Sequence, residues 1–185
     1  MRWNTFLLIV IAPAMTGVSL SAGNFQVDRA VSEVAVKAKA SPPHSFKSVA
    51  QDYEYDIQID PASLAVSNAV FSFNFSDLDS NSAKRDKKMR SWMDVAVNQS
   101  AQFELGRVKV VDGKSVGVGT FSMHGVSKEI EVTFSVTRQG EKLVLDGEAE
   151  FSYEDWGLEI VRLFLFTVKP VIQPHFHLEG ILSDR

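Results

Sequence analysis

Two histidines near the end of the chain are the sharpest candidates for chemistry in the sequence. His175 and His177 are separated by one residue, and alternate residues of a β-strand point to the same side. Two imidazoles on one side could bind one metal ion. The other side of the same stretch carries the apolar Phe176 and Leu178, so the histidines are expected to face solvent, opposite the core. We therefore predict no metal site and keep His175 and His177 only as weak candidates for one.

The remaining residue types give little support for catalysis. The chain has no cysteine, which excludes disulfides, thiolate metal ligands and a cysteine nucleophile. It has no Gly-x-Ser-x-Gly motif and no glycine-rich phosphate loop that opens a helix. Acidic pairs such as Glu129 and Glu131 lie on polar strand faces, whereas a general acid or base needs a cleft that perturbs its pKa. We predict a protein that is not an enzyme and needs no cofactor.

One basic segment stands out in a chain whose net charge is −4. Residues 84–90 contain five basic residues and one acidic residue. One interpretation is a solvated helix face with a structural Arg85–Asp86 pair. The other is a site for an anionic headgroup at a cavity mouth, contacted by Lys84, Arg85 and Lys88. The overall negative charge gives no reason to expect a nucleic-acid partner.

The first 22 residues have the pattern of a secretory signal peptide. Arg2 precedes the apolar run Phe6–Ala12, and the small-residue stretch Thr16–Ala22 follows. A membrane anchor is the alternative, but the run is short and Pro13 interrupts it. We expect residues 1–22 to direct export to the periplasm, with full secretion left open. Residues 23–185 then form one domain, which contains no further long apolar run and hence no expected membrane span.

Alternation of apolar and polar residues dominates the rest of the chain. In residues 52–60, 69–76, 126–136 and 143–153, nearly every second residue is apolar and most of the residues between are polar. This period of two is typical of half-buried β-strands. About eight such strands with short connections predict an all-β antiparallel meander, closed as a barrel or folded as a sandwich.

Three local features interrupt the alternation. In residues 80–94, Met89, Trp92 and Met93 recur at helical spacing, which predicts one short helix. Gly106 stands where the strand around Phe103 slips out of phase, which predicts a β-bulge. Asp112-Gly113 is a strong hairpin signal.

Aromatic residues are concentrated on the predicted inner faces. They could form an ordinary packed core, or they could line a cavity, because a barrel of about eight strands either fills with side chains or holds one small ligand. The candidate cavity residues are Phe71, Phe73, Phe75, Phe103, Phe121, Ile130, Val132, Phe134, Phe151, Tyr153 and Phe176.

Four segments, in order along the chain, resemble the YceI-like family. Residues 25–28 resemble its opening strand, and residues 83–94 resemble its Arg-Asp helix, which leads into the strand with Phe103. Residues 119–128 (GTFSMHGVSK) are similar to its hairpin pattern G-x-L-x-h-x-G-V-T-K. Residues 151–158 (FSYEDWGL) are similar to a strand that ends in an aromatic-Gly-aliphatic turn.

The resemblance implies a lipocalin-like, up-and-down antiparallel barrel around an elongated apolar cavity. It also implies an exported, non-catalytic protein that binds or sequesters an isoprenoid or other amphiphilic lipid. The apolar tail would lie among the inner-face residues and the polar head near the mouth. A barrel with a filled core that binds a protein partner is the alternative, and a homodimer is left open.

Overall fold

The computed structural model describes residues 22–163 and 165–183. The expected signal peptide, residues 1–22, lies outside the described residues except for Ala22. No helix in the described part of the chain is long and apolar enough to cross a membrane.

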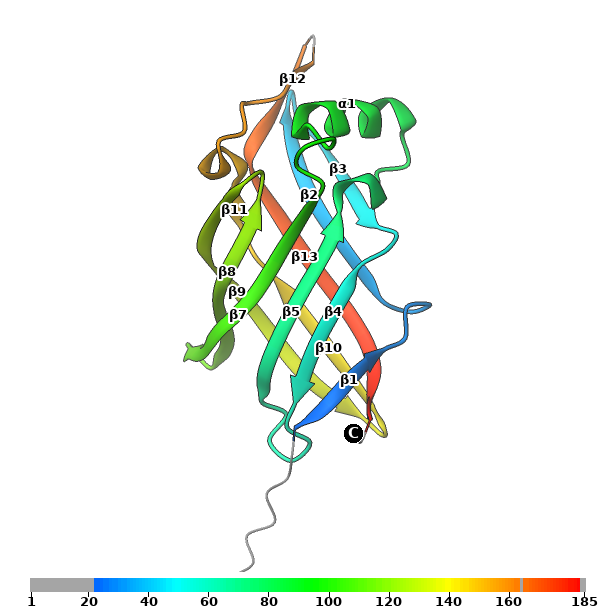
Figure 1. The fold of residues 1–185 in the computed structure, drawn as a ribbon, viewed down its shortest axis with the longest axis vertical. Coiled ribbons are helices and arrows are strands. Elements are labelled where there is room, and N and C mark those ends of the chain that lie inside the picture. The colour runs from blue at the N-terminus through cyan, green and yellow to red at the C-terminus, as the bar shows by residue number, and fades with distance from the viewer. Residues whose placement is uncertain (1–21, 164, 184–185) are drawn as a thin grey trace, which may run out of the picture.

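Eight strands form a closed antiparallel β-barrel (Figure 1). The barrel closes between the first and last strands, where Val27 pairs with Gly180 and Asn24 with Ser183. This confirms the predicted up-and-down barrel and excludes the sandwich. The strands are, in their order around the barrel, β1 (Gly23–Val27), β4 (Glu54–Ile59), β5 (Val66–Asn74), β7 (Ser100–Val111), β8 (Lys114–Met123), β9 (Val126–Gln139), β10 (Lys142–Glu148) and β13 (Phe166–Ser183).

Further strands lengthen one half of the barrel. β2 (Glu33–Ser41) pairs with the edge of β13 that also pairs with β1. β3 (His44–Ala50) pairs with β2, and the short β6 (Leu78–Asp79) pairs with β3. β1 and β2 thus follow one another along β13 as two parts of one interrupted strand. β3 and β4, which pair with β2 and β1, form a second interrupted strand beside it. Two short strands, β11 (Phe151–Ser152) and β12 (Arg162–Leu163), also pair with β13.

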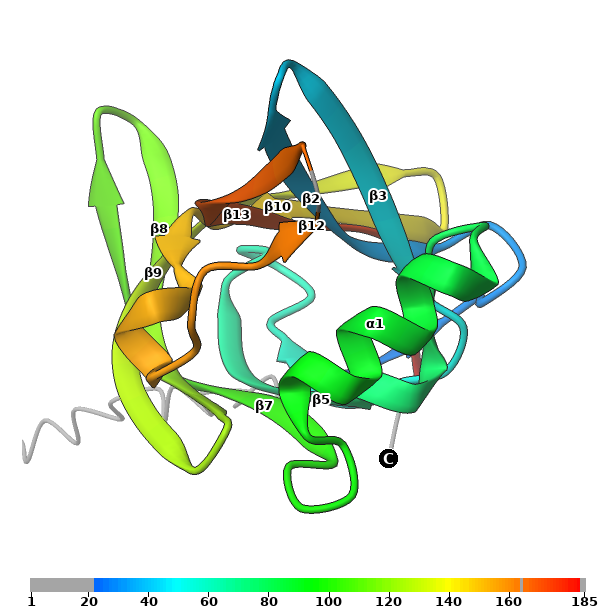
Figure 2. The ribbon, with the colours of Figure 1, turned by 90° about the horizontal axis from the view of Figure 1, so that it is seen from above.

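The predicted helix is confirmed as α1 (Ala83–Met93), which lies at one end of the barrel (Figure 2). Ser82 is its N-cap residue. Met93 is buried and Met89 and Trp92 are half-buried, as their spacing predicts. The indole nitrogen of Trp92 donates a 2.8 Å hydrogen bond to the carbonyl oxygen of Glu159, which ties α1 to the segment before β12. Two 3₁₀ helices, η1 (Phe75–Asp77) and η2 (Tyr153–Trp156), complete the elements.

The two local signals in β7 and its hairpin are also confirmed. The register between β7 and β8 shifts between Leu105 and Arg107, so the bulge lies at Gly106. At the hairpin turn, Asp112 and Gly113 have φ of 49° and 76°, which an Asp-Gly pair tolerates better than most residues do.

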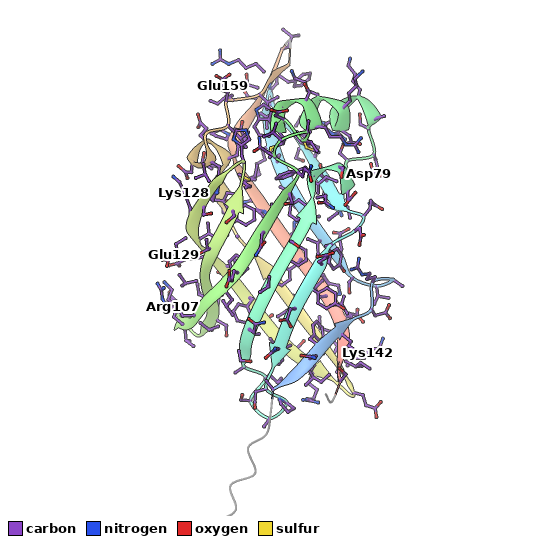
Figure 3. The ribbon with its side chains drawn as sticks, viewed as in Figure 1. Asp79, Arg107, Lys128, Glu129, Lys142 and Glu159 are labelled. Atoms are coloured by element: carbon purple, nitrogen blue, oxygen red, sulfur yellow. The ribbon has the colours of Figure 1, made fainter. Side chains whose placement is uncertain are left out.

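The charged residues that alternate with the apolar ones lie on the outside of the barrel (Figure 3). Arg107 on β7 and Glu129 on β9 form an ion pair with 3.1 Å between Nη1 and Oε2. Lys109 and Glu131 pair in the same way, at 2.6 Å. Val118 of β8 is the direct cross-strand partner of Arg107 and Glu131, so it lies on the same outer face, and it is only 1% exposed. Ion pairs therefore cover part of the outer face of the barrel.

The end of the barrel opposite α1 is solidly packed. Phe25 and Ile59 are 2% and 0% exposed, and Leu143 and Leu178 are 0% and 2% exposed. The hydroxyl of Tyr55 accepts a 2.9 Å hydrogen bond from the amide of Val27 at this end. Apolar packing thus seals one end of the barrel and leaves the other end to be closed by α1 and its neighbouring loops.

Candidate functional site

The barrel encloses a cavity of about 260 Å³ that is partly open to solvent. A water molecule needs roughly 10–15 Å³ of such space, so the cavity is much larger than a packing defect. Ten of the eleven candidate residues border it, namely Phe71, Phe73, Phe75, Phe103, Phe121, Ile130, Val132, Phe134, Phe151 and Phe176. That these residues contact a ligand stays a prediction.

Aromatic rings form continuous tracks on the cavity wall. Phe71, Phe103 and Phe121 are direct cross-strand partners on β5, β7 and β8, so their rings lie at one level of the barrel. Along β5 and into η1, the ring of Phe73 lies 6.3 Å from that of Phe71 and 5.6 Å from that of Phe75. Such contacts fix the rings beside the cavity, because aromatic pairs at these separations attract each other.

Two glycines provide the space that these rings need. A β-carbon on Gly119 would lie 2.6 Å from Cζ of Phe103, and one on Gly147 would lie 2.2 Å from Cζ of Phe176. Only glycine allows the rings to lie this close to the neighbouring strand. Gly119 on β8 and Gly147 on β10 therefore make room for the protein's own side chains.

Several residues of the wall are not among the predicted cavity residues. Met89 and Met93 border the cavity from α1, and their helical spacing was visible in the sequence. β2 and its neighbour β3 also contribute to the wall. Their wall residues include Val34, Val36 and Ala38 on β2 and the aromatic Phe46 on β3. The sequence shows their alternation but not which strands surround the hollow part of the barrel.

Tyr153 is the one candidate that the structure contradicts. The strand predicted over residues 143–153 is split in two, because β10 ends at Glu148 and the two-residue β11 follows at Phe151–Ser152, and Tyr153 begins η2. The side chain packs edge-on against Trp92, with 4.9 Å between the ring centres, and its hydroxyl donates a 3.2 Å hydrogen bond to the carbonyl oxygen of Val168. Burial raises the pKa of this phenol. Tyr153 therefore joins η2 to α1 and does not line the cavity.

The wall of the cavity is almost free of polar groups. The described residues that border the cavity include no Asp, Glu, Lys or Arg. Only Ser48 and His175 among them are polar. A polar group without hydrogen bonds is costly to bury, so this wall disfavours a polar ligand. It favours an occupant whose buried part is hydrocarbon.

The three basic candidates on α1 occupy different environments. Lys84 and Lys88 are exposed, whereas Arg85 is half-buried. Arg85 lies over the ring of Phe46, a wall residue, with 5.1 Å from its guanidinium carbon to the ring centre. Its guanidinium donates to the hydroxyl of Ser80 at 2.8 Å and to the Ser80 carbonyl oxygen at 2.5 Å. Two of the guanidinium nitrogens of Arg85 thus already donate hydrogen bonds within the protein.

Asp86, the acidic residue within the basic segment, is a structural residue. It is 8% exposed, and its Oδ1 accepts hydrogen bonds from the amide and the hydroxyl of Ser80, at 3.1 and 2.5 Å. Ser80 also bonds Arg85, so it joins the two side chains where the chain enters α1. Arg85 and Asp86 therefore do not form the predicted pair directly, and both side chains bind Ser80 instead.

His177 lies among carboxylates on the outer side of β13, whereas His175, whose side chain is 22% exposed, does not face solvent as predicted. His177 Nδ1 is 2.6 Å from Oδ1 of Asp146, and its Nε2 is 3.3 Å from Oε1 of Glu179. The Asp146 hydrogen bond raises the pKa of His177. His175 borders the cavity, but its Nε2 is turned to Glu33, 3.7 Å from Oε1. In the described part of the chain, no three His, Cys, Asp or Glu residues are arranged to hold a metal ion.

The barrel and its cavity agree with a comparison to known protein families. The profile of the YceI-like domain matches residues 25–179. The chain belongs to the YceI-like family. The match includes α1, the cavity wall and all eight strands of the closed barrel, except for the first residues of β1 and the last residues of β13.

Known proteins of this fold have low sequence identity to the chain. A UPF0312 protein of Pseudomonas aeruginosa is 24% identical over 117 residues, which are 59% of this chain and 61% of that protein. The structure of BcnA from Burkholderia cenocepacia superposes with a TM-score of 0.74 at 19% identity, over 84% of this chain and 99% of BcnA. A polyisoprenoid binding domain from Saccharophagus degradans, implicated in plant cell wall breakdown, has a TM-score of 0.61 at 12% identity, over 88% of this chain and 99% of that domain.

Proposed function

We propose that this YceI-like protein binds a long apolar or amphiphilic lipid of the polyisoprenoid type inside its barrel, without catalysis. The observation that carries the proposal is the cavity of about 260 Å³ with an uncharged, largely aromatic wall. A hydrocarbon tail that leaves water for such a wall gains about 25 cal/mol for each Å² that it buries. The polyisoprenoid binding domain of the same fold makes this lipid class the first to test.

The polar head of the lipid is assigned to the α1 end of the barrel. The other end is sealed by packed side chains such as Ile59 and Leu143, each 0% exposed. At the α1 end, Lys84 and Lys88 are exposed and Arg85 borders a wall residue. A phosphate or carboxylate could accept hydrogen bonds from these cations while the tail stays among the rings.

Sequestration is favoured over catalysis because the cavity lacks reactive groups. No carboxylate, lysine or arginine borders it within the described residues, and the polar Ser48 and His175 lie on different strands of its wall. A protein that holds lipid in this way would act after export, which we propose residues 1–22 direct. N-terminal sequencing of the protein recovered from the periplasm tests that step, and a mature chain that still begins at Met1 contradicts it.

The decisive experiment identifies what the barrel contains. Purified protein is extracted with organic solvent, and the extract is analysed by mass spectrometry against a mock purification. The expected result is one class of long-chain lipid in a fixed ratio to protein. The alternative of a solid barrel that binds a protein partner predicts an extract equal to the mock and no uptake of added lipid.

A cavity-filling variant separates interior binding from surface adsorption. Val132 borders the cavity on β9, whereas Ser135 on the same strand is exposed. Val132→Trp should abolish uptake of a farnesol that carries a dansyl fluorophore, because the indole occupies the space. Ser135→Trp is the matched control and should bind as the wild type does. Equal binding by both variants would exclude the cavity as the site.

A further inference from the structure

The hairpin between β12 and β13 exposes apolar side chains at the α1 end of the molecule. Leu165 is 84% exposed and Phe166 is 46% exposed. Figure 1 shows this hairpin projecting beyond the barrel at that end. Large apolar residues at a projecting tip are costly to expose to water unless the tip meets an apolar surface.

A second hairpin tip lies against the first. Ser41, at the end of β2, pairs with Thr167 of β13. His44 starts β3, and its ring lies 6.3 Å from that of Phe166. Pro42 and Pro43, which lie between Ser41 and His44 in the chain, are both exposed. The two tips together form one projecting surface, which we call the apical tip surface and define as residues 41–44, 165 and 166.

Basic residues surround the apical tip surface although the chain as a whole is negative, with a net charge of −4. A shallow groove beside it is lined by Lys39, Lys169 and His44. Arg162, at the start of β12, is exposed, and so is Lys87 on α1 at the same end of the barrel. The exposed acids of this end include Glu154, Asp155 and Glu159, in and just after η2, and Asp94, the C-cap residue of α1.

We propose that the apical tip surface docks onto the surface of an anionic lipid bilayer. Leu165 and Phe166 would enter the boundary between headgroups and acyl chains, and Lys39, Lys169 and Arg162 would contact anionic headgroups. A bilayer fits this surface better than a protein does, because it offers an apolar interior to the tip side chains and anionic headgroups to the cations around them. Docking in this way turns the α1 end, where Met89 and Met93 border the cavity, toward the membrane.

Vesicle co-sedimentation tests the proposal on the wild-type protein. Vesicles that contain phosphatidylglycerol should sediment with the protein, whereas vesicles of phosphatidylcholine alone should bind it much less. Binding should weaken as salt is raised, because salt screens the headgroup contacts. Equal binding to both kinds of vesicle, or binding to neither, would overturn the proposal.

Two double variants separate the apolar and the charged contributions. Leu165→Ser with Phe166→Ser should weaken partitioning by about tenfold or more, since both side chains lose the transfer out of water. Lys39→Gln with Lys169→Gln should remove most of the preference for phosphatidylglycerol. The matched controls lie on the hairpin between β7 and β8, away from α1. They are Val110→Ser, at a residue that is 72% exposed, and Lys114→Gln, and both should bind as the wild type does.

The docking proposal and the interior-binding proposal fail separately. Uptake of dansyl-farnesol without vesicles measures the cavity alone, and the tip variants should keep wild-type uptake and wild-type thermal stability. Protein that takes up the probe but ignores anionic vesicles refutes docking and leaves the cavity function standing. Protein that docks through the tip but takes up no probe supports docking and refutes the cavity function.

Discussion

His177 is the residue whose protonation the structure controls most directly. The hydrogen bond to Asp146 raises its pKa above the ordinary value of 6.5. A raised pKa means that the folded state binds the proton more tightly than the unfolded state does. The stabilisation is therefore complete below the ordinary pKa and is lost as the pH rises through the raised one.

We expect urea unfolding to show a lower free energy of unfolding above this pH window than below it. Asp146→Asn should flatten the profile, because it removes the charge that favours the imidazolium. The pKa of His177 can be followed directly by NMR titration of the ring. A His177 pKa at or below 6.5 in the wild type would refute the assignment.

Asp86 offers a residue-level test of the turn before α1. Asp86→Ala leaves the amide and hydroxyl of Ser80 without their acceptor in a buried position. We expect a loss of about 1–3 kcal/mol in the free energy of unfolding, measured with urea. Asp86→Asn keeps Oδ1 and should lose less, so equal losses in the two variants would contradict the role of the hydrogen bonds.

At the scale of elements, closure of the barrel depends on the pairing of β1 with β13. A β-carbon on Gly180 would lie 2.0 Å from the carbonyl oxygen of Gln26, which is backbone and cannot move aside without breaking the pairing. Gly180→Ala should lower the free energy of unfolding by about 1–3 kcal/mol or more. It should also speed hydrogen exchange of the β1 amides.

Gly117→Ala is the control for that variant. Its β-carbon would lie 3.0 Å from Cδ1 of Leu105, the end of a side chain that can rotate away. We expect a smaller loss of stability and unchanged exchange in β1. Fast exchange of β1 amides in both variants would show that β1 does not depend on the close approach at Gly180.

The elements also show where the pattern of the sequence stops being informative. Alternation predicts the strands and the phase slip predicts the bulge at Gly106, because both are local properties of a pleated chain. The same alternation continues through Tyr153, yet the strand ends before it. Packing decides this, since the ring of Tyr153 meets that of Trp92 of α1 and its hydroxyl donates to the carbonyl oxygen of Val168. These contacts join segments far apart in the sequence.

For the whole molecule, a bound lipid should stabilise the fold. A ligand that binds only the folded state, present at about 100 times its dissociation constant, adds about 2.7 kcal/mol. In a chain of this size that corresponds to a rise of roughly 5–10 °C in Tm. Protein refolded without lipid should melt lower and recover its Tm when farnesol is added. Val132→Trp should show no recovery, and a recovery there would place the stabilising site elsewhere.

The sequence by itself determined which side chains face inward, because successive β-carbons of a strand point to opposite sides of the sheet. This is why ten of the eleven selected residues border one cavity. Only the tertiary structure decided that the interior is hollow. The cavity depends on the wall residues that β2 and β3 contribute, on the glycines that admit the rings of Phe103 and Phe176, and on the packing of Phe25 and its neighbours at one end. These are contacts between segments that are distant in the sequence, so no local sequence pattern predicts the volume of the cavity.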